Sequence, residues 1–186
     1  MTKEQLKLAM PHASVKNLDR AWLPLDQAMS KFQINNPARQ QMFLAQLAHE
    51  SGELRYTREL ADGKAYDTRT DLGNTPAVDG DGELTKGRGY IQITGTTNYI
   101  ACGKALGVDF MKYPEKLEEP YYAAMSAGWF WFSRGLNEMA DVNTEAAFLR
   151  VSIKINGKNR KTGLPNHWLE RLAYWSLAKV AFQKIK

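Results

Sequence analysis

The chain has 186 residues, of which 44% are hydrophobic and 24% are charged, so it can bury a core and lacks the composition of a disordered chain. Its formal net charge of +5 favours anionic partners, and nucleic acid, anionic lipid and peptidoglycan all stay open, as does a charge that serves only solubility. The single cysteine, Cys102, excludes an intrachain disulfide. No apolar run reaches the roughly 20 residues of a membrane span, so we expect one globular domain over residues 1–186 without stable membrane insertion.

Helix signals dominate the chain, with breaks at turn residues. The predicted helices span residues 3–10, 18–32, 37–50, 97–106, 120–134, 144–155 and 166–183. Pro24 is expected to interrupt the second helix, whereas Pro37 suits the first turn of the third. Residues 62–89 are rich in glycine, proline, aspartate and asparagine and are expected to form loops. The alternation at residues 90–94 predicts a short strand, so the fold class is mainly α with one small β element.

A carboxylate on an apolar helix face is the first candidate for chemistry. Phe43, Leu47 and Glu50 stand at positions i, i+4 and i+7 and therefore share one face, and Gly52 is a helix stop signal. Burial and the negative end of the helix dipole would both disfavour an ionised Glu50, which is what a general acid needs near neutral pH. A core glutamate neutralised by an arginine or lysine elsewhere in the chain is the alternative that this segment leaves open.

Hydrolysis of a glycoside with inversion needs a second carboxylate roughly 6.5–9.5 Å from the acid. Glu53, Glu59 and Asp62 are the nearby candidates. Glu53 would touch Glu50 if the helix continued, and Glu59 would lie on the opposite side of such a helix. Glu59 can therefore serve only if the helix breaks near Gly52 and the chain folds back.

Four separated blocks resemble glycoside hydrolase family 19, the chitinase-like family that includes bacteriophage endolysins. They are Ala48–Gly52, residues 72–75 with Asp79–Gly82, Gly87–Gly95 followed by Asn98 and Tyr99, and Ile155–Gly157 with Arg171 downstream. Their common order along the chain makes the resemblance much more specific than any single block. It implies a lysozyme-like, mainly α-helical domain with two lobes and a central cleft, and an inverting reaction that needs no metal or cofactor.

The resemblance also implies roles for individual residues. Glu50 matches the general acid, Glu59 the general base and Thr94 the hydroxyl residue that positions the attacking water. The matched substrate-binding positions are Gln92, Asn98, Tyr99, Asn156 and Arg171, the last also expected near the base. One departure is Thr96, which follows Gly95 where many endolysin-type relatives have arginine.

No metal is expected from the local motifs either. His49 and Glu50 begin an H-E-x-x-H pattern, but position 53 is Glu53 rather than histidine. The acidic residues at 79–83 lack the glycine of a calcium loop, because Leu84 occupies that position.

The expected function is that of an endolysin that hydrolyses β-1,4 bonds of peptidoglycan glycan strands. We expect a monomer with no nucleic-acid partner, made in a bacterial cytoplasm because residues 1–10 lack a signal peptide's apolar core. It would act on the cell wall after release, and the resemblance implies a holin-type release partner. Three alternatives stay open: a chitinase of the same family, a lytic transglycosylase, and a catalytically inactive wall-binding module.

Overall fold

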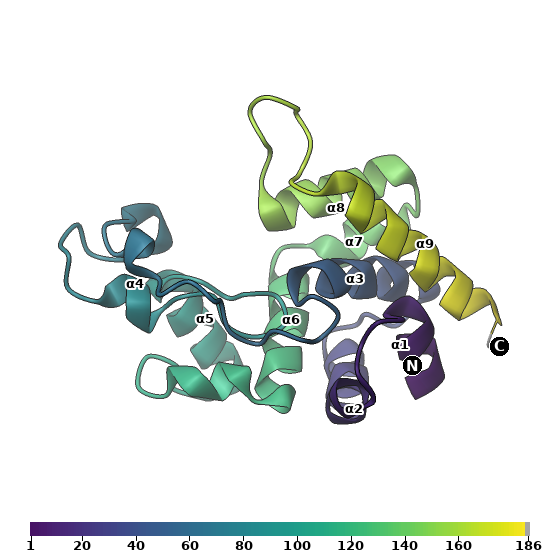
Figure 1. Ribbon diagram of the computed structural model, residues 1–186, viewed down its shortest axis with the longest axis horizontal. Helices are drawn as coiled ribbons and strands as arrows, with labels where there is room; N and C mark the ends of the chain where they lie inside the picture. Colours follow the sequence, from purple (N-terminus) through teal and green to yellow (C-terminus); the bar gives the residue numbers. More distant parts are fainter. Residues whose placement is uncertain (185–186) are drawn as a thin grey trace.

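The structure, a computed structural model, describes residues 1–184 and is mainly helical, as the sequence predicts (Figure 1). The α-helices are α1 (Lys3–Ala9), α2 (Val15–Lys31), α3 (Pro37–Glu50), α4 (Asp81–Leu84), α5 (Thr96–Leu106), α6 (Pro120–Ser133), α7 (Leu136–Asp141), α8 (Glu145–Asn156) and α9 (Trp168–Lys184). Three 3-10 turns are η1 (Lys64–Tyr66), η2 (Thr70–Leu72) and η3 (Pro114–Glu118). None of the helices within residues 1–184 is both long and apolar enough to span a membrane.

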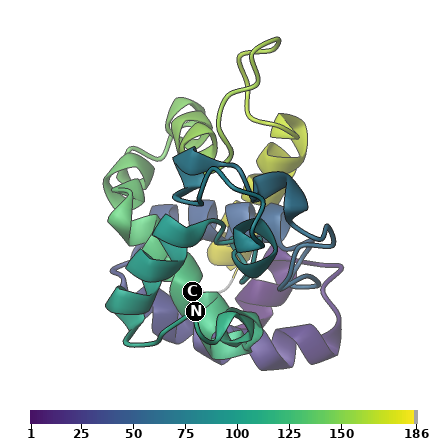
Figure 2. The same ribbon diagram turned by 90° about the vertical axis from the view of Figure 1, so that its left-hand side faces the viewer.

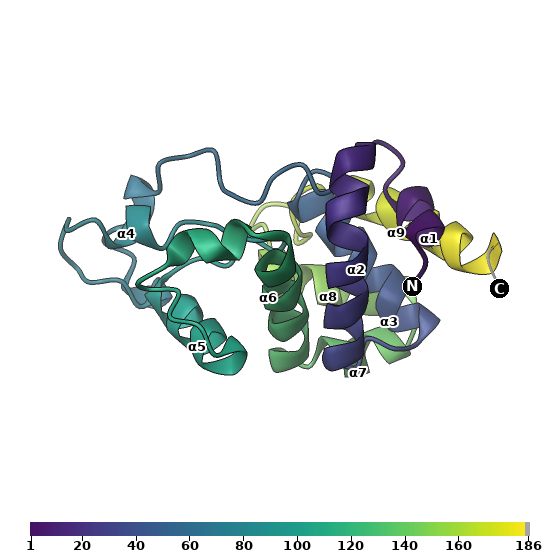
Figure 3. The same cartoon turned by 90° about the horizontal axis from the view of Figure 1, so that it is seen from below.

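The helices gather at two ends of an elongated molecule. In Figures 1 and 3, α4 and α5 lie at one end, α1, α2, α3 and α9 at the other, and α6 between them. The described parts of both termini lie on the side of α1 and α9 (Figure 1). The hairpin that connects α8 to α9 projects beyond the helices, which is clearest in Figure 2.

Helix α3 is the central element, and all of its residues from Gln41 to Ala48 are buried. It begins where the sequence predicts, because the side chain of Asn36 accepts a hydrogen bond from the Arg39 amide at 2.9 Å and Pro37 occupies the first turn. It packs mainly on α9. This packing brings the last turn of α3 against the first turn of α9.

Pro24 lies inside an unbroken α2, so the predicted interruption at Pro24 is wrong. An internal proline costs about 3 kcal/mol because it removes a helix hydrogen bond. Leu18, Leu25 and Met29 of the same helix are buried, and each contributes roughly 1.5–3 kcal/mol when fully removed from water. Their burial outweighs the cost of the proline, and α2 packs closely against α6.

The predicted strand at residues 90–94 is also wrong, because this segment is a tight loop. Gln92 has a φ of 57°, a left-handed conformation that ends any extended run. Arg88 and Ile93 close the loop by exchanging backbone hydrogen bonds of 3.0 and 2.8 Å. Within residues 1–184 the β structure consists of isolated bridges between Arg88 and Ile93 and between Arg58 and Arg88.

The predicted loop at residues 62–89 contains short helical turns, and one buried asparagine ties it to α5. Asn74 donates to the Tyr66 carbonyl at 2.8 Å and accepts from the backbone and hydroxyl of Thr96 at 3.1 and 2.9 Å. Thr96, the residue that departs from the family pattern, therefore anchors the loop at the start of α5.

Candidate active site

Glu50 is the last residue of α3, and the chain turns sharply after it. Gly52, Glu53 and Leu54 have consecutive φ values of 55°, 56° and 67°, and the Ser51 hydroxyl accepts the Leu54 amide at 2.7 Å. Three left-handed residues in a row cannot continue an α-helix. The predicted break near Gly52 is confirmed, and the role of Glu59 as the base stays a prediction.

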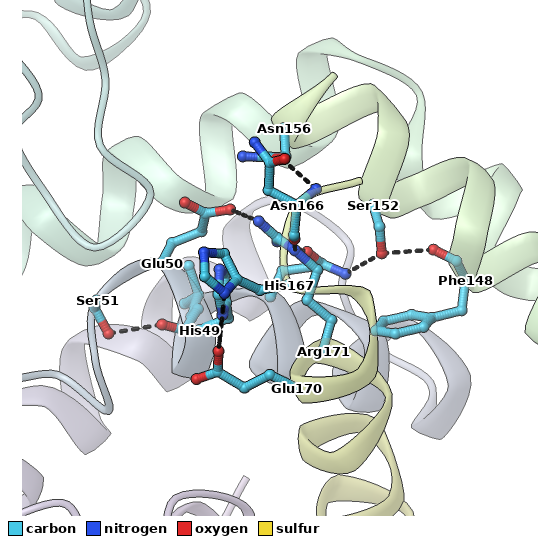
Figure 4. Close-up of polar contacts among 12 residues, drawn as sticks. His49, Glu50, Ser51, Phe148, Ser152, Asn156, Asn166, His167, Glu170 and Arg171 are labelled. Carbon is cyan, nitrogen blue, oxygen red and sulfur yellow. Dashed lines mark hydrogen bonds and ion pairs between the residues drawn. The ribbon is translucent and has the colours of Figure 1, made fainter. Parts of the chain in front are cut away.

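The side chain of Glu50 forms an ion pair with Arg171 of α9, with 2.7 Å between Oε1 and Nη2 (Figure 4). Arg171 is fully buried, whereas the Glu50 side chain keeps 17% of its exposure. The two atoms form an ion pair but not a hydrogen bond, since neither Glu50 Oε1 nor Arg171 Nη2 has a hydrogen-bond partner among residues 1–184. The expected apolar surroundings of Glu50 are therefore wrong, because a cation compensates its carboxylate.

Arg171 is held in place from several directions. Its Nη1 donates to Gln46, its Nε donates to the Asn166 carbonyl at 3.1 Å, and Gln46 in turn donates to Ser152 at 2.7 Å. Arg171 is fully buried and its charge lies on the predicted acid. Its expected positions near the base and against substrate stay predictions.

His49, which precedes Glu50, lies against Glu170, which precedes Arg171. His49 Nδ1 lies 3.2 Å from Glu170 Oε2, and the His167 ring lies 5.3 Å from that of His49 (Figure 4). Burial, followed by the charge of Arg171, lowers the pKa of His49. The contacts of residues 49 and 50 with residues 170 and 171 join the end of α3 to the start of α9.

Beside Glu50 lies an open cleft of about 310 Å³. Three predicted residues, Gln92, Thr94 and Asn98, line it together with Glu50. The Thr94 hydroxyl donates to the Gln92 carbonyl at 2.9 Å, and the Asn98 amide donates to the Thr94 carbonyl at 2.8 Å. The Thr94 oxygen therefore keeps lone pairs that can accept a hydrogen bond from a water molecule.

Glu59 lies next to the Gln92 wall of this cleft. Its carboxylate accepts the Tyr66 hydroxyl at 2.8 Å and the Gly87 amide at 3.1 Å. A Cβ atom at Gly87 would lie 2.7 Å from Gln92 Oε1 and 3.2 Å from Glu59 Oε2, so both side chains reach the same glycine. Burial and the bond to Glu59 raise the pKa of Tyr66 to about 12, so the phenol remains a donor at neutral pH.

Tyr99 and Asn156, like Glu59 and Arg171, are not among the residues that line the cleft. Tyr99 is fully buried, with its hydroxyl donating to the Lys86 carbonyl at 2.6 Å and accepting from Arg88 at 2.7 Å. Its contact with substrate stays a prediction that this burial does not support. Asn156 is exposed, and its Oδ1 accepts the Asn166 amide at 2.9 Å, which ties the end of α8 to the residues before α9 (Figure 4).

Phe130, Arg134 and Lys154 also line the cleft, and they lie outside the family blocks that predicted the site. Phe130 lies inside the helix predicted at residues 120–134, and Arg134 directly follows α6, where no motif marks it. Lys154 stands one position before the predicted Ile155–Gly157 block, and its place next to that block was the sequence feature that could have marked it as a cleft residue. Cys102 is buried and does not line the cleft, and burial raises the pKa of its thiol to about 12.

Comparison with known proteins now identifies the family. The profile described as chitinase class I, glycoside hydrolase family 19, matches residues 41–162, well over half of the chain. A glycosyl hydrolase family 19 domain-containing protein of Haemophilus influenzae is 30% identical over 177 residues, with 79% of this chain and 82% of the relative covered. The chain belongs to glycoside hydrolase family 19.

Plant relatives and solved structures extend this comparison. An endochitinase of Arabidopsis thaliana is 34% identical over 135 residues, which cover 68% of this chain and 44% of the plant protein, so the match spans less than half of that relative. Chitinase C of Streptomyces griseus shares the fold, with a TM-score of 0.77 at 23% identity, over 98% of this chain and 92% of that one. The family 19 class IV chitinase of Zea mays gives a TM-score of 0.74 at 19% identity, with the same coverage.

Proposed function

We propose that this chain is a single-domain glycosidase that hydrolyses β-1,4 bonds of peptidoglycan with inversion, and that it serves as an endolysin. Family membership supports hydrolysis of glycosidic bonds. The observation that carries the assignment to this site is the position of Glu50, on the wall of an open cleft that it shares with Gln92, Thr94 and Asn98. A glutamate that served only to neutralise Arg171 would need no opening beside it.

In the proposed reaction the protonated form of Glu50, rather than the carboxylate that pairs with Arg171, donates its proton to the glycosidic oxygen as the bond to the anomeric carbon breaks. Arg171, 2.7 Å away, stabilises the carboxylate that remains. Glu59 accepts a proton from a water molecule that attacks the anomeric carbon from the opposite face, and Thr94 offers that water a hydrogen-bond acceptor. The Tyr66 hydroxyl and the Gly87 amide hold Glu59 in place.

Gln92 and Asn98 would bind the substrate. Both carry amide groups that can donate and accept, which suits the acetamido groups of an amino-sugar polymer. Their own side chains are oriented by the Gly89 and Thr94 carbonyls, at 2.8 Å in both cases. Asn156 is a weaker candidate, since it does not line the cleft and its Oδ1 accepts the Asn166 amide.

Peptidoglycan and an endolysin role are proposals that rest on charge and on the sequence resemblance. The net charge of +5 suits an anionic wall polymer, and the resemblance to endolysins extends to a monomer made in the host cytoplasm and released by a holin-type partner. A chitinase is the second candidate, because the proteins with similar sequence and fold are named as chitinases.

One experiment separates these candidates. Purified protein is incubated with peptidoglycan sacculi and, in parallel, with chitin oligomers, and the products are analysed by mass spectrometry. The proposal expects reducing ends from sacculi, whereas 1,6-anhydro ends would indicate a transglycosylase. Cleavage of chitin alone would show that the protein is a chitinase and not a peptidoglycan hydrolase. Binding to sacculi without cleavage would indicate a wall-binding module.

A further inference from the structure

Arg134 is a charged residue of the cleft that the proposed reaction does not use. It follows the C-terminus of α6, and its guanidinium lies 3.5 Å from the centre of the Phe130 ring. One nitrogen donates to Asn98 Oδ1 at 3.0 Å and another donates to Ser133 Oγ at 3.3 Å. A guanidinium carries five N–H donors, so these two bonds leave donors free for a ligand.

No carboxylate among residues 1–184 forms an ion pair with Arg134, although the side chain is half-buried. Burial lowers the pKa of this guanidinium, the direction expected for a cation that has lost water without gaining an anion. Cations in such surroundings are normally paired. Arg134 therefore has an unmet requirement for negative charge inside a substrate cleft.

Lys154 adds a second uncompensated cation. It lies in the last turn of α8, is exposed, and lines the same cleft with no hydrogen bond or ion pair to another residue of the described chain. Glu50 is the acidic residue of the cleft lining, and the buried Arg171 already neutralises it. The two free cations thus face the cleft without a balancing carboxylate in its lining.

Positive charge continues from Lys154 along the adjoining hairpin. Lys158, Arg160 and Lys161 are exposed on the loop between α8 and α9, and that loop projects beyond the helices (Figure 2). The hairpin is closed by hydrogen bonds of 2.9 Å from the Asn159 amide to the Leu164 carbonyl and from the Gly163 amide to the Asn159 carbonyl.

We propose that Arg134 and Lys154 form an anion subsite in the cleft that binds a carboxylate carried by the substrate strand. This inference rests on the proposed action on peptidoglycan, whose stem peptides bear carboxylates, whereas chitin is uncharged. Arg134 supplies directed donors for a carboxylate, and Lys154 supplies a mobile charge at the opening. The basic hairpin attracts the same acidic strand from a longer distance.

The test compares two forms of one substrate. Soluble, uncrosslinked peptidoglycan strands are used as they are and after carbodiimide coupling with methylamine, which converts their carboxylates to neutral amides. Release of reducing ends gives kcat/KM for each form. The wild type should prefer the acidic strands by about tenfold, the range of one charge-assisted hydrogen bond. A ratio near one would overturn the subsite without touching the proposed hydrolysis.

The variants assign the preference to residues. Arg134→Gln should lower the ratio of the two kcat/KM values from about ten towards one, and Arg134→Lys should keep most of it. Lys154→Gln should lower it less, because an exposed charge is screened by solvent. Lys16→Gln, a change at an exposed lysine of α2, is the matched control and should leave the ratio at the wild-type value.

One outcome would show that Arg134 has only a structural role, and another would show that the proposed action on peptidoglycan is itself wrong. An equal loss on both strands in Arg134→Gln would mean that Arg134 only positions Asn98, and would overturn the subsite. No cleavage of either strand by the wild type, with cleavage of a neutral chitin oligomer, would overturn the peptidoglycan assignment and the subsite together. If Arg134→Gln does not fold, the ratio measured for the wild type and for Lys154→Gln still tests the subsite.

Discussion

Arg171 Nη2 lies 2.7 Å from Glu50 Oε1 and joins the first turn of α9 to the last turn of α3. These residues are 121 positions apart in sequence, so the candidate acid depends on correct docking of the C-terminal helix. The Arg171 side chain is fully buried and its other donors are held by Gln46 and Asn166. The position of Glu50 is thus fixed by the fold rather than by its own helix alone.

Removal of the Arg171 charge should destabilise the protein as well as the site. Arg171→Gln leaves Glu50 without a counter-charge and Gln46 without its donor, and breaking a buried pair costs about 3–5 kcal/mol, less here because Glu50 is partly exposed. Urea denaturation should show a loss of about 2 kcal/mol or more. The control Lys16→Gln should show no measurable loss, and an unchanged unfolding midpoint in Arg171→Gln would contradict the structural role of this pair.

Glu59→Gln tests the second carboxylate. The amide oxygen can still accept from the Gly87 amide, and the NH2 group can donate to the Tyr66 hydroxyl oxygen, so the fold should persist while the ability to take a proton from water is lost. We expect kcat to fall by about 10²–10⁴-fold with little change in KM. Tyr66→Phe, which removes only the hydrogen bond that Tyr66 donates to Glu59, should lower kcat much less. Retention of wild-type kcat in Glu59→Gln would move the base to another residue.

Gly87→Ala should disturb the site through a steric effect. The new methyl group would lie 2.7 Å from Gln92 Oε1 and 3.2 Å from Glu59 Oε2, so both side chains must shift. A displacement of this size at a reacting group can reduce kcat/KM by about 10²-fold. The comparison is Gly80→Ala, where no atom lies within 4 Å but a φ of 97° strains the loop. Equal activities of the two variants would show that Gly87 does not set the distance between Glu59 and Gln92.

Stability should fall in mild acid because of His49. Burial lowers the pKa of His49 in the folded state, so below about pH 6.5 the unfolded chain binds the proton more readily. The contribution of His49 to the free energy of unfolding is therefore complete above the pKa of histidine in the unfolded chain, and it is lost as the pH falls below that value. Unfolding midpoints between pH 7 and pH 5 should decline less in His49→Asn than in the wild type, and the exposed His167→Asn serves as control. Parallel profiles for wild type and His49→Asn would refute this assignment.

The sequence predicted the helices where local signals agree with packing. Asn36 and Pro37 mark the start of α3, and the apolar spacing placed Glu50 at its end. Pro24 is a case in which tertiary burial outweighs local propensity. The loop at Arg88–Ile93 escaped prediction because Gln92 adopts a left-handed conformation that no residue type announces. Helices α4 and α7 are too short to show a helical period.

The candidate site could be predicted only where motifs mark it. Gln92, Thr94 and Asn98 were found through the family blocks, whereas Glu50 was also marked by its helical spacing, and the structure places all four around one cleft. Tyr99 sits in such a block but faces the interior, because a motif does not indicate the direction of a side chain. Arg171 could not be paired with Glu50 from sequence, since their contact depends on how α9 docks.

The proposed function depends on proton donation by Glu50, and the rate of bond cleavage by Glu50→Gln tests it most directly. Glutamine is close in shape and cannot donate the proton, so reducing-end release from peptidoglycan strands should fall by about 10²-fold or more, while sedimentation with sacculi stays near that of the wild type. The unfolding midpoint should fall, because the buried Arg171 loses its counter-charge, so the rates are compared under conditions in which both proteins are folded. A variant that cleaves the strands at the wild-type rate would contradict the assignment of Glu50 as the acid.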